Sequence, residues 1–248
     1  MLDVRTVAFL LVLTLGVSVV VHAVNWRMHP QLRGPGWWTA GGATLITGAV
    51  LVALRGRIPD LLSIVVANGC LVGAQVLMLR GSCAFAGASM PWRASLAALA
   101  VQLGGFAWYT YGDPSLLARW WLLGGASAWV LALNLVIMRR LWRVEGTLGV
   151  GMYAGSTTAT LLLLLAIPAA LTSTDGDTAR LFDPSGVTAF GLMLFAATVM
   201  FQTFGRLLMT ANRTQRELTR LALMDPLTGV ANRRAFDEAL DRSMAVAR

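Results

Sequence analysis

Seven runs of about 20 apolar residues, separated by short segments rich in Arg, Pro and Gly, dominate this chain. A bilayer core requires roughly that length of apolar helix for each crossing. Inside lipid the backbone polar groups must be satisfied within the segment, so each run predicts a helix. The seven predicted spans are Val4–Asn25, Trp37–Leu54, Leu61–Leu79, Trp92–Tyr111, Leu116–Met138, Leu148–Leu171 and Val187–Met209.

Composition supports the same class of protein. Hydrophobic residues make up 56% of the 248 and charged residues 13%, whereas charged residues are about a quarter of a soluble domain. The net charge of +8 comes entirely from arginines at the ends of apolar runs, so it indicates topology and no nucleic-acid partner. Cys70 and Cys83 lack metal or CxxC spacing and are predicted to be free thiols. The fold class expected is an all-α membrane protein in a lipid bilayer.

The distribution of arginines predicts which end lies inside. Seven spans place the termini on opposite sides, and basic residues favour the cytoplasmic side. The cluster Arg139-Arg140-x-x-Arg143 and the arginines at and beyond the end of the last span, Arg206 among them, therefore predict a cytoplasmic C-terminus and an N-terminus outside. A signal-peptide cleavage site at Val21-His-Ala23 is the alternative and would leave six spans, but the acidic Asp3 argues against it.

A few amide side chains are predicted to lie at membrane depth, where polar groups are costly unless they are satisfied. They are the candidates for an intramembrane site, although hydrogen bonding between helices is their more common role. No span is expected to carry Asp, Glu or Arg at mid-depth, which argues against a transporter or channel with a charged pathway. His22, near a membrane face, lacks a second ligand at metal spacing, and no metal site is predicted. The candidate amides are Asn68, Gln75, Gln102 and Asn134, with Gln202 in the last span.

Glycine-rich spans predict close helix packing. Gly151-x-x-x-Gly155 is the clearest pair of small residues on one helix face, and such pairs let helix backbones approach.

Residues 206–224 are predicted to form a helix that continues out of the membrane. Leu207, Ala211, Thr214, Leu218 and Leu221 have heptad spacing. A second seam, Leu208, Ala211, Gln215, Leu218 and Ala222, is nearly as good. A homodimer joined through this signalling helix is expected, and Pro226 should end the helix at Asp225.

The segment that follows carries a motif, Asp225-Pro-Leu-Thr-Gly-Val-Ala-Asn-Arg-Arg. It resembles the opening of the GGDEF domain, the catalytic domain of diguanylate cyclases, with Val230 in place of the usual Leu. In that family the Asn of this motif and an Asp nine residues later bind the guanine of GTP, and the resemblance assigns these roles to Asn232 and Asp241. From its sequence position, Asn232 can also cap a new helix. The matching motif residues are Asp225, Leu227, Thr228, Gly229, Asn232, Arg233 and Arg234.

The resemblance implies three parts: a seven-helix sensor at residues 1–205, the signalling helix at 206–224, and at 225–248 the first segment of an α/β nucleotide-cyclase-like domain. It implies a homodimeric enzyme of the bacterial cytoplasmic membrane that uses Mg²⁺ to join two GTP into cyclic di-GMP. The Gly-Gly-Asp/Glu-Glu-Phe loop and the metal ligands of the family are expected beyond Arg248. No catalytic residue is assigned within the 248, and the fragment is predicted to be inactive.

Two other functions stay open. One is a degenerate GGDEF domain that binds GTP or cyclic di-GMP, with or without a phosphodiesterase domain. The other is a seven-helix transporter or receptor whose tail matches by chance, which would require a water-filled path or a charged intramembrane residue.

Overall fold

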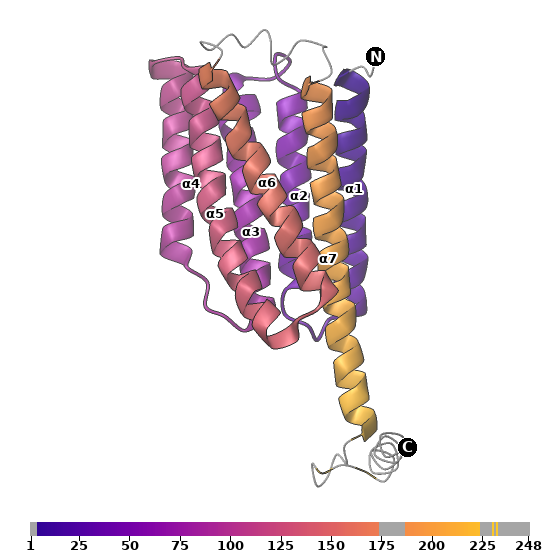
Figure 1. The fold of residues 1–248 in the computed structure, drawn as a ribbon. Helices are drawn as coiled ribbons and strands as arrows, with labels where there is room; N and C mark the ends of the chain where they lie inside the picture. Colours follow the sequence, from indigo (N-terminus) through magenta and orange to yellow (C-terminus); the bar gives the residue numbers. More distant parts are fainter. Residues whose placement is uncertain (1–3, 174–186, 224–229, 231, 233–248) are drawn as a thin grey trace.

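The computed structural model describes residues 4–173 and 187–223, together with Val230 and Asn232. These residues form a bundle of long helices, and no strand occurs among them (Figure 1). The elements are α1 (Val4–Met28), α2 (Pro35–Ala53), the π-helical segment η1 (Leu61–Val66), α3 (Ala67–Ala86), α4 (Trp92–Ala107), the π-helical segment η2 (Trp108–Gly112), α5 (Leu116–Glu145), α6 (Leu148–Ser173) and α7 (Val187–Leu223).

The helices run alternately up and down, and the last helix closes against the first (Figure 1). Helix α7 lies between α6 and α1, α3 contacts both α2 and α5, and α4 packs against α5 and against η1 and α3. Because the number of helices is odd, α1 and α7 run parallel to each other. The core of the bundle is built from large side chains that are almost fully buried, including Trp38, Leu79, Phe85, Tyr153 and Met209.

Six of the described helices are long and apolar enough to cross a membrane: Phe9–Met28, Pro35–Ala53, Leu61–Ala86, Leu116–Glu145, Leu148–Ala169 and Phe190–Leu223. The predicted span Trp92–Tyr111 is also helical, but its α-helix has 16 residues and changes to π-helix at Trp108. The all-α membrane class is therefore supported, with six spans.

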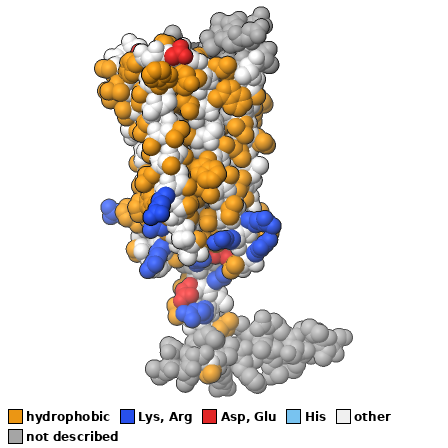
Figure 2. All heavy atoms as spheres, turned by 90° about the vertical axis from the view of Figure 1, so that its left-hand side faces the viewer, with side chains coloured by type: hydrophobic (Ala, Val, Ile, Leu, Met, Phe, Trp, Pro, Cys, Tyr) orange, Lys and Arg blue, Asp and Glu red, His pale blue; other side chains and the backbone are white. Residues whose placement is uncertain are grey.

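The outside of the bundle is as apolar as its core. Large hydrophobic side chains such as Phe9, Val101, Leu162 and Phe201 are more than half exposed. A surface of this kind suits lipid and not water. On the face in Figure 2, hydrophobic side chains cover the height of the bundle and basic side chains gather near the end from which α7 emerges.

Helix α7 is 37 residues long, about 55 Å of continuous helix, and it extends well beyond the rest of the bundle (Figure 1). It passes without a break through the predicted boundary between residues 205 and 206. Its described end is Leu223, shortly before Pro226.

The close helix contact predicted at Gly151 and Gly155 lies elsewhere. A Cβ on Gly155 would meet nothing within 4 Å, and one on Gly151 would meet the Trp142 ring. The intimate crossing joins Gly149 of α6 to Gly205 of α7, where an added Cβ on either glycine would lie within 2.9 Å of the other's carbonyl oxygen. The sequence prediction of close packing through α6 holds, but the glycines named for it were wrong because spacing within one helix cannot show which face meets a neighbour.

Candidate functional site

A ladder of polar side chains joins the first helix to the last. The Ser18 and Thr203 hydroxyls share a hydrogen bond, and the Asn25 amide donates to the Thr210 hydroxyl at 3.2 Å. Between these two rungs, Arg206 Nη1 donates to His22 Nε2 at 3.1 Å. In each pair the two residue numbers differ by 184 or 185. The difference stays nearly constant because the two helices run parallel and advance together along their contact.

Arg206 is the centre of this ladder, and only 2% of it is exposed. Besides His22, its guanidinium donates to Gln202 Oε1 and to the Tyr153 hydroxyl, each at 3.2 Å, and to the Met78 sulfur at 3.4 Å. The last predicted span therefore carries a charge that is buried within the bundle, which the sequence analysis did not predict. Arg206 was assigned to the tail, but the bundle continues for seven residues, about 10 Å, to the level of Arg213.

Aromatic rings take the place of a carboxylate around this cation. The guanidinium carbon lies 4.5 Å from the centroid of the Tyr153 ring and 5.9 Å from that of Trp38. Such cation–π contacts contribute about 2 kcal/mol when desolvated. Among the described residues Arg206 forms no ion pair, so its charge is held by neutral acceptors and rings alone.

Tyr153 extends the network across the bundle. Its hydroxyl oxygen accepts hydrogen bonds from Asn134 Nδ2 at 2.8 Å and from Arg206, and it lies 3.4 Å from the Ser82 hydroxyl. Tyr153 is fully buried. One hydroxyl thus connects α3, α5, α6 and α7, and Arg206 carries the connection on to α1.

The amides that the sequence singled out do not gather at one site, and most of them link helices. Gln75 donates to Ser127 at 3.1 Å, and Gln102 donates to the Asn68 carbonyl oxygen at 3.0 Å. Asn68 donates to Ile64 in its own helical segment at 2.7 Å. Only Asn134, through Tyr153, and Gln202 belong to the Arg206 network.

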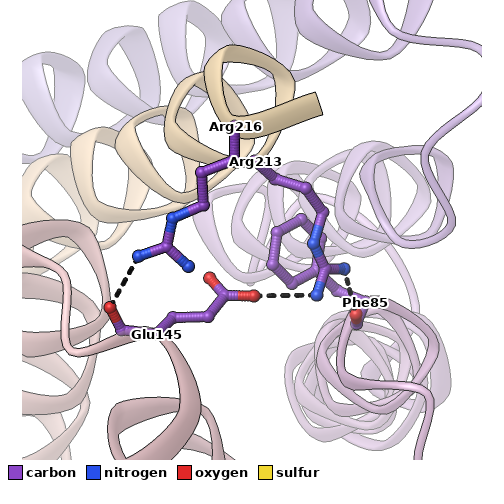
Figure 3. Close-up of polar contacts among 4 residues, drawn as sticks. All are labelled: Phe85, Glu145, Arg213 and Arg216. Atoms are coloured by element: carbon purple, nitrogen blue, oxygen red, sulfur yellow. Dashed lines mark hydrogen bonds and ion pairs between the residues drawn. The ribbon is translucent and has the colours of Figure 1, made fainter. Parts of the chain in front are cut away.

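A second set of contacts fixes α7 where it leaves the bundle (Figure 3). Arg213 pairs with Glu145 at 2.8 Å and donates to the carbonyl oxygen of Phe85, whose ring lies 4.1 Å from the guanidinium carbon. Arg216 donates to the carbonyl oxygen of Glu145 at 2.8 Å. We call these four residues the exit clamp.

The exit clamp is built from helix ends. Helices α3 and α5 both stop at glycines with positive φ, Gly87 and Gly146, which is a common way to end a helix. The last carbonyls of a helix lack partners within it and attract cations. Arg213 and Arg216 supply donors to one such carbonyl in each helix, so the clamp orients α7 by two fixed points.

We expect Glu145→Ala to loosen α7 at its exit. The Glu145 side chain is 6% exposed, so its bond to Arg213 is largely shielded from water. Its loss should raise amide hydrogen exchange in residues 212–220 by about tenfold, as expected when a charged hydrogen bond contributing about 1.4 kcal/mol is removed.

The matched control is Glu217→Ala. Glu217 pairs with Arg220 at 3.1 Å, but both side chains are more than half exposed, and exposed pairs contribute little. Equal exchange in the two variants would show that the exit clamp does not hold the helix.

Most motif residues lie outside the described residues: Asp225, Leu227, Thr228, Gly229, Arg233, Arg234 and Asp241. Asn232 is described, and it contacts the end of α7. Its backbone N–H donates to the Leu223 carbonyl at 2.9 Å, and its side-chain amide donates to the Ala222 carbonyl at 2.8 Å. In the described part of the chain Asn232 therefore caps the C-terminal end of α7.

Residues 4–173 and 187–223 contain no group of three or more His, Cys, Asp or Glu side chains placed to hold a metal ion. Cys70 and Cys83 are free cysteines, as predicted.

A sequence signal for the ladder existed and was missed. Ser18, His22 and Asn25 have 4-3 spacing, and Thr203, Arg206 and Thr210 have 3-4 spacing, so each set lies on one helix face. Two polar stripes at matching depth in the first and last spans predict that these spans pair. A search for known relatives adds no further assignment, since no family model, curated protein or solved structure matches the chain.

Proposed function

We propose that the bundle is the membrane sensor and dimerisation module of a diguanylate cyclase of the GGDEF family. The observation that carries the proposal is the course of α7. This helix belongs to the polar core at Arg206, passes the exit clamp and ends at Leu223, directly before the motif that begins at Asp225. A rearrangement around Arg206 would move a rigid helix whose far end leads into the GGDEF-like segment.

We also propose a topology for the bundle. Helix α3 and helix α5 run in the same direction (Figure 1), so the chain between them returns across the bundle through α4 and η2. We therefore assign α4 with η2 as a seventh crossing. The basic end in Figure 2 is the end from which α7 emerges, and the positive-inside rule places that end in the bacterial cytoplasm.

The partner proposed for the exposed end of α7 is a second copy of the chain. Leu218 and Leu221 are 62% and 61% exposed beyond the exit clamp. Leu208, part of the second predicted seam, packs against Gly149 inside the bundle. The part of the seam that is open to a partner therefore lies C-terminal to Leu208. Because a diguanylate cyclase holds one GTP on each subunit, such a dimer would bring the two substrates together.

Dimerisation through this face predicts crosslinking at Leu218. In a background with Cys70→Ser and Cys83→Ser, Leu218→Cys should form a disulfide-linked dimer in the membrane under mild oxidation. Non-reducing electrophoresis would measure the dimer fraction.

Arg220→Cys is the control, since it is equally exposed but two residues away, on roughly the opposite face. Crosslinking at position 220 and not at 218, or at neither, would contradict the proposed interface.

The catalytic part of the proposal is tested in the intact reading frame. With Mg²⁺ and GTP, the purified protein should make cyclic di-GMP, and Asn232→Ala or Asp241→Ala should reduce kcat/KM for GTP while leaving the Leu218→Cys crosslink unchanged. Nucleotide binding without product would favour a degenerate GGDEF module. If both substitutions are silent in an active enzyme, the guanine assignment is wrong.

One observation favours a second candidate, a seven-helix receptor or transporter. A buried charge in a membrane bundle is expensive and generally marks a functional site. Arg206 is such a charge. Uptake of a labelled anion by proteoliposomes that requires Arg206 would support transport, whereas binding without uptake would support a receptor.

A further inference from the structure

A small cavity lies beside Arg206, between α1, α2 and α7. Its polar lining is Ser18, His22, Gln202, Thr203 and Arg206, and the wall is completed by Gly42 with a few apolar side chains. The cavity volume is about 20 Å³. Because about 10–15 Å³ on this measure suffices for one water molecule, the space holds one particle of that size or slightly larger.

The hydrogen bonds around the cavity leave donors without acceptors. A guanidinium can only donate, so the contact between Arg206 and His22 Nε2 requires that nitrogen to accept. The imidazole is then neutral with its proton on Nδ1. His22 Nδ1 and Arg206 Nε both lack a hydrogen-bond partner among the described residues, although each side chain is 98% buried.

The unpaired charge of Arg206 also favours an occupant that accepts hydrogen bonds. In the described part of the chain the Arg206 guanidinium forms no ion pair, and its polar partners are the neutral side chains of His22, Tyr153, Gln202 and Met78. A buried cation of this kind is stabilised most by a counter-charge at short range. An occupant of the cavity that accepts hydrogen bonds and carries negative charge would supply the counter-charge that the buried guanidinium lacks.

We propose that this cavity binds a single small anion of halide size, with chloride the physiological representative. The volume excludes sulfate, phosphate and carboxylate metabolites, and the donors exclude a cation. The site uses residues from the first, second and last helices, so occupancy would hold α1 and α7 together around Arg206. This assignment concerns the bundle alone and stands whether or not the chain belongs to a cyclase.

The test is anion-dependent stability of the full chain in detergent. Starting from sodium gluconate, addition of sodium chloride or bromide at constant ionic strength should raise Tm saturably, by about 2–4 °C for a chain of this length. Sodium sulfate should give no saturable rise, only the gradual stabilisation expected of a salt that is excluded from the protein surface. Bromide anomalous scattering in crystals should show a peak in the cavity beside the His22–Arg206 hydrogen bond.

Two variants locate the effect. Arg206→Gln should abolish the halide response, while Arg216→Gln, the same charge change at the exposed edge of the exit clamp, should keep it. If Arg206→Gln does not fold, Ser18→Val provides the second variant, since it narrows the cavity and retains the cation, and it too should lose the response.

Two results would overturn the assignment. One is an equal Tm of the wild-type protein in gluconate, chloride and bromide, with no bromide peak, which would mean that water alone fills the cavity. Another is a halide response that survives in Arg206→Gln or Ser18→Val, which would place the anion elsewhere.

Discussion

Replacing Gly205 with leucine is expected to separate α6 from α7 and to lower Tm by about 10 °C, equivalent to roughly 3 kcal/mol for overpacking in a chain of this length. A Cβ at this position would lie 2.8 Å from the Tyr153 backbone nitrogen and 2.9 Å from the Gly149 carbonyl oxygen. These are backbone atoms, which cannot move aside as the tip of a side chain can. The helices must part, and the neighbouring Arg206 must move with α7.

The matched control is Gly191→Leu, in the same helix, where an added Cβ would meet nothing within 4 Å. Both substitutions add the same volume and each replaces one glycine of α7, so the difference between their Tm values reports the crossing alone. Tm is measured by thermal unfolding of detergent-solubilised protein with tryptophan fluorescence. An equal loss in the two variants would show that α6 and α7 are not held at this glycine contact.

The positions of the helices followed from the apolar runs, while their ends did not. Helix α5 was predicted to stop at Met138, where the apolar run ends, but it continues to Glu145. A lipid span ends where polar residues begin, whereas a helix ends where the backbone turns, and here that is Gly146 with its positive φ. Because of these two extra turns, Glu145 lies within hydrogen-bond distance of Arg213. The two residues are 68 positions apart, and no local sequence pattern predicts their contact.

The candidate site was predictable only in part. Membrane-depth amides were identified correctly as polar groups that need partners, and Gln75, Gln102 and Asn134 bond across helices. Arg206 was misplaced because an arginine near the end of an apolar run usually extends to the interface. Its depth depends on how far neighbouring helices continue past it, which requires the packed bundle. Helices α1 and α7 pair because the bundle closes on itself. In the sequence, the matched spacing of polar residues in the first and last spans is the signal for this pairing.

Removing a single oxygen from the centre of this network is expected to have the other large effect. Tyr153→Phe leaves the ring, its packing and its cation–π contact with Arg206 in place. It deletes the acceptor used by both Asn134 and Arg206. Arg206 keeps Gln202 Oε1 and the Met78 sulfur as acceptors, but the Asn134 amide is left without one. A buried donor without an acceptor costs about 1–3 kcal/mol, so Tm should fall by roughly 3–9 °C.

Tyr111→Phe is the control, because Tyr111 is 59% exposed and the loss of its hydroxyl should change Tm little. An unchanged Tm in Tyr153→Phe would mean that other acceptors replace the hydroxyl and that the network does not stabilise the bundle.

The physical cause can be separated further with a double variant. If the loss in Tyr153→Phe comes from unsatisfied donors, then adding Asn134→Leu removes one of those donors and should recover part of the lost stability, since replacing both partners of a buried hydrogen bond by apolar groups is often nearly neutral. If the loss came instead from poorer packing around the ring, Asn134→Leu would add a second defect and Tm would fall again. The sign of that change decides whether polar satisfaction or shape holds α5, α6 and α7 together around Arg206.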